Sequence, residues 1–143
     1  MLIESLSQSK VIVDTSAIYA MYVDSDSNHE DALTTLNLIH ENRYKLFLCP
    51  TTIQEAYTLI LKKTNWRSAN NLFQWLEDNL ETTQLVWQPT AQTETQRLLN
   101  YYKGVKISYH DALCVAYATS HSIGKVFTFD DDFKIMGMDT IPF

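Results

Sequence analysis

The sequence has 143 residues, of which 45% are apolar, and its 17 acidic residues outnumber 11 basic ones to give a formal net charge of −6. A negative field disfavours nonspecific nucleic-acid binding by the bulk surface, because such binding depends on basic patches that displace counterions from phosphates. The N-terminal MLIESLSQS lacks the features of a secretory signal, and no run of about 18 apolar residues occurs. We therefore expect one cytoplasmic domain over residues 1–143, without membrane association.

Four short runs rich in β-branched and aromatic residues predict buried strands, at residues 10–14, 45–49, 84–87 and 126–129. Apolar periodicity between these runs predicts helices, at residues 16–22, 28–42, 52–63, 66–80, 90–103 and 108–122. Strands that alternate with helices imply right-handed crossovers, so we expect an α/β fold with a mainly parallel sheet covered on both faces. Ligands of such sheets bind beyond the carboxyl ends of the strands.

Acidic residues follow the first and the last predicted strands. Asp14 comes directly after VIV, and Asp130, Asp131 and Asp132 follow VFTF. Both places have a local alternative, since Asp14 can cap the next helix and an acidic run after a strand is commonly a solvated turn. Because the carboxyl ends of parallel strands meet at one edge of the sheet, we expect the two groups to converge.

Two further acids stand near predicted helix starts. Glu55 lies three residues after Thr52, and Asp111 lies three residues after Ser108, which is the offset of a capping box. Glu55 nevertheless falls about 200° around the helix from Ile53, away from the main apolar stripe. Asp111 precedes a stretch that is apolar all round, which favours a position facing a cleft. Both residues therefore stay open between a capping role and a site role.

Carboxylates that converge require a counter-charge. Two of them held about 5 Å apart repel by roughly 3 kcal/mol at an effective dielectric constant near 20. Lys134 is the one basic residue that lies beside these acids in the sequence. Hard oxygen ligands suit Mg²⁺ or Mn²⁺, so we expect one of these cations as a cofactor.

The stretches VIVDTSAIYAMY, SNHEDAL, TTIQEAYTLI, YHDALCVAYAT and VFTFDDDFKIMGM cover nearly the whole chain in this order. Together they resemble a PIN domain, and specifically the VapC-type toxin ribonucleases of bacterial toxin–antitoxin pairs. The resemblance implies a Rossmann-like three-layer α/β/α sandwich with a mainly parallel sheet of four to five strands. It also implies metal-dependent endonucleolytic cleavage of RNA that leaves a 5′-phosphate.

Position by position, the resemblance implies that Asp14, Glu55, Asp111 and Asp130 are the metal-binding catalytic acids. Asp132 would be an auxiliary ligand or a replacement for the last of them. The resemblance further implies a homodimer and a cognate antitoxin protein that holds the enzyme inactive. Hydrogen bonds around the acids would come from three hydroxyl groups, those of Thr15, Ser16 and Thr128.

Two other functions remain open at this stage. A haloacid-dehalogenase-like phosphatase also places an Asp at the end of its first strand, but its signature requires a second Asp where this chain has Ser16. A PIN-like module could instead bind RNA or protein without cutting it, although the presence of all four acids argues against that.

Cysteine, histidine and aromatic residues suggest structural roles. Cys49 and Cys114 lie in the apolar stretches LFLCP and ALCVA, which favours unpaired buried thiols over a disulfide or a metal site. The four histidines show no zinc-site spacing, so we interpret each as a surface or packed residue. A helical stripe of large apolar residues is expected to pack in the core, and it comprises Trp66, Phe73, Leu76 and Leu80.

Overall fold

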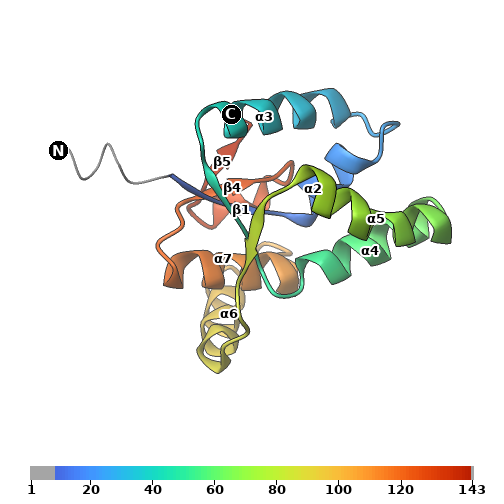
Figure 1. Cartoon of the computed structure of the whole chain (residues 1–143). Coiled ribbons are helices and arrows are strands. Elements are labelled where there is room, and N and C mark those ends of the chain that lie inside the picture. Colours follow the sequence, from blue (N-terminus) through green and yellow to red (C-terminus); the bar gives the residue numbers. More distant parts are fainter. Residues whose placement is uncertain (1–8, 143) are drawn as a thin grey trace.

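A five-stranded sheet forms the centre of the structure, a computed structural model that describes residues 9–142. Its strands are β1 (Lys10–Val13), β2 (Lys45–Leu48), β3 (Thr82–Gln84), β4 (Lys125–Phe127) and β5 (Asp139–Ile141). Every neighbouring pair is parallel, and the spatial order is β3-β2-β1-β4-β5 (Figure 1). The predicted α/β fold with a parallel sheet is therefore confirmed.

Helices cover both faces of this sheet. They are α2 (Thr15–Tyr22), α3 (His29–Glu41), α4 (Thr52–Lys63), α5 (Trp66–Asn79), α6 (Pro89–Tyr101), α7 (Tyr109–Ser120) and the short α8 (Asp132–Ile135). Buried residues of α2, α3, α4 and α5 belong to one apolar cluster, and those of α6, α7 and α8 belong to a second. Figure 1 shows α6 and α7 below the sheet and α3 above it. None of the helices described is long and apolar enough to cross a membrane.

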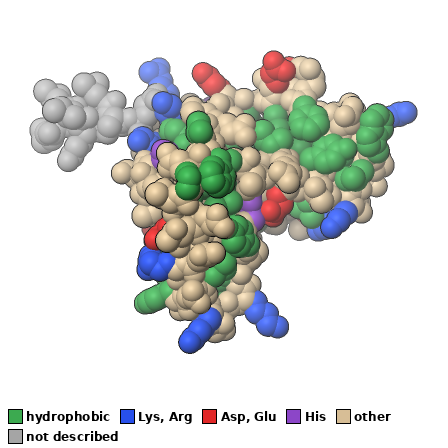
Figure 2. Space-filling model, turned by 90° about the horizontal axis from the view of Figure 1, so that it is seen from below, with side chains coloured by type: hydrophobic (Ala, Val, Ile, Leu, Met, Phe, Trp, Pro, Cys, Tyr) green, Lys and Arg blue, Asp and Glu red, His purple; other side chains and the backbone are tan. Residues whose placement is uncertain are grey.

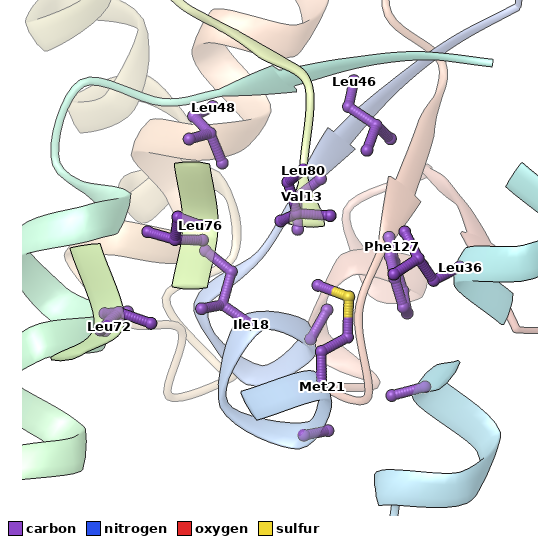
Figure 3. Packing of buried hydrophobic residues seen from close by; sticks show 14 of the residues in the cluster. Val13, Ile18, Met21, Leu36, Leu46, Leu48, Leu72, Leu76, Leu80 and Phe127 are labelled. Carbon is purple, nitrogen blue, oxygen red and sulfur yellow. The ribbon is translucent and has the colours of Figure 1, made fainter. Parts of the chain in front are cut away.

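Strand β1 is buried on both sides because successive side chains alternate between the two faces. Val11 and Val13 join the first cluster, in which Val13 lies near Ile18 and Phe127 in Figure 3, while Ile12 joins the second. A run of β-branched residues without polar interruption is what a strand in this position requires. Since β1 lies between β2 and β4, its carboxyl end opens at the middle of the sheet edge, where the strand order reverses.

The strand predicted at residues 84–87 is displaced in the structure. Strand β3 occupies Thr82–Gln84 and pairs with β2 through Thr82, Thr83 and Gln84. Leu85 beyond it is buried, but Val86 is 77% exposed and continues no ladder. An edge strand has a neighbour on only one side, so polar residues can form it and apolarity locates it poorly.

The aromatic stripe of α5 was expected to pack in the core, and this is only half right. Leu76 and Leu80 are buried, whereas Trp66 is 63% exposed and Phe73 stacks on Tyr57 of α4 at the surface. The buried side of α5 is instead formed by small and aliphatic side chains that include Ala69 and Leu72. Helical spacing identified a face of α5, but it could not tell how far around the helix the core extends.

Replacing Leu72 with alanine should lower the free energy of unfolding by about 2–5 kcal/mol, because its fully buried side chain would leave a cavity in the first cluster. Trp66→Ala, on the same helix but mostly exposed, should cost less than about 1 kcal/mol. Urea denaturation followed by circular dichroism measures both. Equal losses for the two variants would contradict the placement of α5.

Candidate active site

Asp14 lies at the carboxyl end of β1, where its backbone N–H donates to the carbonyl of Phe127 in β4 at 2.9 Å. The side chain is only 3% exposed. Its Oδ2 accepts hydrogen bonds from the Ser16 hydroxyl at 2.7 Å, the Thr128 hydroxyl at 2.9 Å and the Ser16 N–H at 3.3 Å. Its Oδ1 is buried and has no hydrogen-bond partner among residues 9–142. Asp14 therefore caps α2 with one oxygen and leaves the other free.

The acidic run after β4 forms a turn that also points into the site. The N–H of Asp132 donates to Asp130 Oδ1 at 2.9 Å, and the N–H of Asp130 donates to the Thr128 hydroxyl at 3.0 Å. Asp130 and Asp132 are half-buried, while Asp131 is exposed. Carboxylate oxygens of Asp111, Asp130 and Asp132 all lie within 4.8 Å of one another, and we call these residues the three-aspartate group. The predicted turn occurs, and although Asp14 is not part of this group, the Thr128 hydroxyl bonds both to Asp14 Oδ2 and to the N–H of Asp130.

Asp111 reaches this group from the first turn of α7. Its N–H donates to Oγ of Ser108, the N-cap of the helix, at 3.1 Å, while its own buried carboxyl faces Asp130. Burial raises the pKa of Asp111 to about 8, and the negative charges of Asp14 and Asp130 contribute to the rise. Burial and the neighbouring charges of Asp130 and Asp131 likewise raise the pKa of Asp132. Without a cation the group therefore retains a proton at neutral pH.

Glu55 lies in α4 and does not join the three-aspartate group. The capping-box alternative is wrong, because Thr51 is the N-cap, makes no side-chain capping bond, and Thr52 is already helical. Glu55 Oε2 instead lies 3.1 Å from Nδ1 of His110. The Glu55 side chain is 46% exposed and lines a pocket of about 420 Å³ together with His110. Glu55 thus connects to the other acids through a histidine.

His110 is the residue that the sequence analysis undervalued. It is buried between α4 and Asp14, with the Thr51 hydroxyl 3.0 Å from Nδ1 and the Thr15 hydroxyl 3.3 Å from Nε2. Nε2 also lies 3.4 Å from Sγ of Cys114, one helical turn further along α7. The sequence contained one usable signal, since residues four apart on a helix share a face and His110 adjoins a candidate catalytic acid.

The prediction of two unpaired buried thiols is confirmed. Cys49 follows β2 and Cys114 lies in α7, and the two thiols influence each other's ionisation. The neighbouring Cys114 thiol lowers the pKa of Cys49, while the Cys49 thiol and burial raise the pKa of Cys114. Any proton therefore stays on Cys114 in preference to Cys49.

The acids are not neutralised by basic side chains. Among residues 9–142, no Lys or Arg nitrogen lies within 4.0 Å of Asp14 or of the three-aspartate group. Lys134 lines a pocket of about 170 Å³ together with Thr128 and Asp130, so it is a basic residue that shares a pocket with one of these acids. On the face seen in Figure 2, Lys and Arg side chains lie mostly toward the edges, while a histidine lies beside an acidic side chain nearer the middle. The site is suited to an added cation.

The chain therefore has a parallel α/β fold with acidic residues gathered beyond the carboxyl ends of its central strands. Residues 11–137 match the PIN domain family, and the chain belongs to it. No curated protein sequence matches the chain significantly.

Solved structures with the same fold include two from bacterial toxin–antitoxin systems. VapC20 of Mycobacterium tuberculosis, described as a Sarcin-Ricin loop cleaving toxin, aligns with a TM-score of 0.74 at 18% identity, over 90% of this chain and 95% of that one. VapBC2 of Rickettsia felis, bound to a DNA fragment from its promoter, aligns with a TM-score of 0.69 at 13% identity, over 92% and 96%. At these identities the likeness establishes the fold.

Proposed function

We propose that the chain is a metal-dependent endoribonuclease of the VapC type that hydrolyses RNA phosphodiester bonds. The observation that carries this proposal is the meeting of carboxylates from the end of β1, α7 and the turn after β4, where no Lys or Arg nitrogen of residues 9–142 lies within 4.0 Å of them. Such a constellation is costly for a folded protein unless a cation joins it. Membership of the PIN family supports a nuclease in particular.

The residues present fit Mg²⁺ or Mn²⁺. Asp14 Oδ1 is a buried anionic oxygen without a partner among the residues described, and the three-aspartate group offers further oxygens within 4.8 Å of one another. Asp14, Asp111 and Asp130 would hold the cation, with Asp132 beside them and Glu55 at the outer edge of the site. A bound divalent cation supplies a water of lowered pKa and a positive charge for the phosphate oxygens.

The chain's own side chains prepare this centre. The Ser16 and Thr128 hydroxyls fix the orientation of Asp14, so that Oδ1 needs no reorganisation to act as a ligand. Asp111 holds a proton in the metal-free protein and releases it when positive charge enters the site, because the charges that raise its pKa are then compensated. Lys134 is placed to attract a phosphate toward Asp130. Ser16, which stands where a dehalogenase-like phosphatase needs an acid, serves Asp14 as a hydrogen-bond donor.

We further propose that the protein is the toxin of a toxin–antitoxin pair, that it forms a homodimer, and that a cognate antitoxin protein inhibits it. Two fold relatives support this proposal through what their descriptions state of them. One is a toxin that cleaves the Sarcin-Ricin loop, and the other is a VapBC complex bound to promoter DNA.

The purified protein should cleave single-stranded and structured RNA in the presence of Mg²⁺ or Mn²⁺ and leave 5′-phosphate ends, with no cleavage in excess chelator. RNA-end sequencing and gel analysis measure this outcome. An aryl phosphomonoester, incubated in parallel, should not be hydrolysed. Turnover of the phosphomonoester without RNA cleavage would favour the phosphatase, and folded protein that binds Mn²⁺ but cuts neither substrate would favour an inactive PIN-like module.

A further inference from the structure

Asp14 also belongs to a second group of potential metal ligands, which shares no residue with the three-aspartate group. Ligand atoms of Asp14, His110 and Cys114 all lie within 4.8 Å of one another, and all three residues are buried. We call these residues the buried cluster. Unlike the hard carboxylate oxygens of the three-aspartate group, it combines oxygen, imidazole nitrogen and sulfur.

The separation of nitrogen and sulfur in this cluster is that of two ligands on one ion. Bonds of about 2.3 Å to sulfur and about 2.05 Å to nitrogen at a tetrahedral angle place these atoms about 3.5 Å apart. His110 Nε2 and Cys114 Sγ are 3.4 Å apart. An ion could therefore enter between them with little movement of α7, which carries both residues at helical positions i and i+4.

The surroundings of His110 select the ring nitrogen that faces the cluster. Nδ1 lies 3.1 Å from the Glu55 carboxylate, which can only accept, so Nδ1 carries the proton and Nε2 presents its lone pair inward. Metal-bound histidines are typically held in this way, with the second nitrogen donating to a carboxylate or carbonyl. The Thr51 hydroxyl, 3.0 Å from Nδ1, supports the same orientation.

Asp14 supplies the third potential ligand of the buried cluster. A thiol donating to Nε2 explains the contact between Cys114 and His110 without any metal. Asp14 adds a carboxylate oxygen within 4.8 Å of both ligand atoms, and its buried Oδ1, which has no hydrogen-bond partner among residues 9–142, is the oxygen that the proposed catalytic cation also needs. Cys49 lies outside the three-residue cluster, and its sulfur contacts the Thr51 hydroxyl at 3.7 Å.

We propose that the buried cluster binds a borderline-soft divalent cation of the Zn²⁺ type through Asp14, His110 and Cys114, with release of the Cys114 proton to solvent. Imidazole and thiolate favour Zn²⁺ over Mg²⁺, whereas the three-aspartate group favours the hard cation. Of the cluster residues, His110 lines the pocket of about 420 Å³ that also contains Glu55, so the cluster lies next to this pocket. A further part of the proposal rests on the proposed function. Zinc bound to the cluster inhibits RNA cleavage, because it binds the Asp14 carboxylate that the catalytic cation needs.

Cobalt titration tests the site without any assay of activity. Metal-free protein with reduced thiols should bind one equivalent of Co²⁺ and develop a thiolate-to-cobalt charge-transfer band, which Zn²⁺ abolishes and excess Mg²⁺ does not. Cys114→Ser should lose the band, while Asp130→Asn should keep it because Asp130 lies outside the buried cluster. Absence of the band in the wild type, or its persistence in Cys114→Ser, overturns the proposal.

A thiol-labelling measurement covers the case in which Cys114→Ser fails to fold. One equivalent of Zn²⁺ should slow alkylation of Cys114 in the wild-type protein by at least about tenfold, as judged by mass spectrometry of its peptide, and unchanged labelling would contradict the site. In the nuclease assay, one equivalent of Zn²⁺ should reduce Mg²⁺-dependent cleavage by at least about tenfold. A cobalt band in a protein that never cuts RNA would refute the proposed function alone, and an active enzyme without the band would refute the zinc site alone.

Discussion

Asp14→Asn should reduce Mg²⁺-dependent RNA cleavage by at least about 10³-fold, a loss of roughly 4 kcal/mol in transition-state stabilisation. The amide oxygen of asparagine can still accept from the Ser16 and Thr128 hydroxyls, so the local structure should persist. The negative charge is lost, and with it the buried oxygen that is free to bind a cation. Initial rates at saturating Mg²⁺ give the size of the effect.

Thermal unfolding of Asp14→Asn, followed by circular dichroism, should show a midpoint at or slightly above that of the metal-free wild type, because one of the charges facing Asp111 is gone. Asp131→Asn is the matched control, since Asp131 is exposed and precedes α8 beside the site. It should keep at least half of the wild-type activity. Retention of more than a tenth of the activity by folded Asp14→Asn would remove Asp14 from the catalytic centre.

The second large effect concerns the stability of the metal-free protein as the pH changes. The carboxyl of Asp111 has a pKa of about 8 in the folded protein, against about 3.9 for an unfolded chain. Between these values the folded state holds a proton that the unfolded state lacks, so raising the pH favours unfolding. The free energy of unfolding therefore begins to fall near pH 4, falls further as the pH rises, and stops falling from this cause above about pH 8.

Asp111→Asn should remove most of this dependence, because an amide carries no charge at any of these pH values. We expect the variant to match the wild type near pH 4 and to exceed it by about 1–3 kcal/mol at pH 8.5, or roughly 3–10 °C in Tm. This is less than the roughly 5–6 kcal/mol of the whole shift, because the neighbouring Asp130 and Asp132 are only half-buried and water screens part of the repulsion.

Melting curves recorded in chelator from pH 4 to 8.5 measure the effect. Addition of Mn²⁺ at pH 8 should raise the Tm of the wild type and leave that of Asp111→Asn nearly unchanged, since cation binding compensates the same charge. Asp131→Asn should retain the wild-type slope. Parallel pH curves for wild type and Asp111→Asn would show that Asp111 ionises normally in the folded protein.

Central strands were easier to predict than edge strands, for a physical reason. The residues of β1 are buried on both faces and therefore apolar without interruption, so the sequence located this strand to within one residue. Strands β3 and β5 have three residues and one neighbour each; β3 has no buried residue, and β5, with two buried residues, is too short to give a clear pattern. The first was displaced in the prediction by two residues, and the second was not assigned to any residues.

The site was predictable as far as strand geometry determines it. Asp14 and Asp130 follow neighbouring parallel strands, so their meeting was expected from topology. The role of Glu55 could not be predicted in the same way. Its position three residues after Thr52 is compatible both with a capping box and with a side chain that faces a histidine of another helix. Deciding between them required the position of His110 relative to α4, which depends on the packing of whole helices.

The pairing of β1 with β4 has a consequence for the nascent chain. More than a hundred residues separate Val13 from its ladder partner Phe127, and the central strand has only one neighbour until β4 has been synthesised. Asp130 and Asp132 come later still. On the ribosome, the polypeptide therefore cannot bring its acidic residues together until almost all of it has emerged, so the proposed cation site would form only after translation is nearly complete.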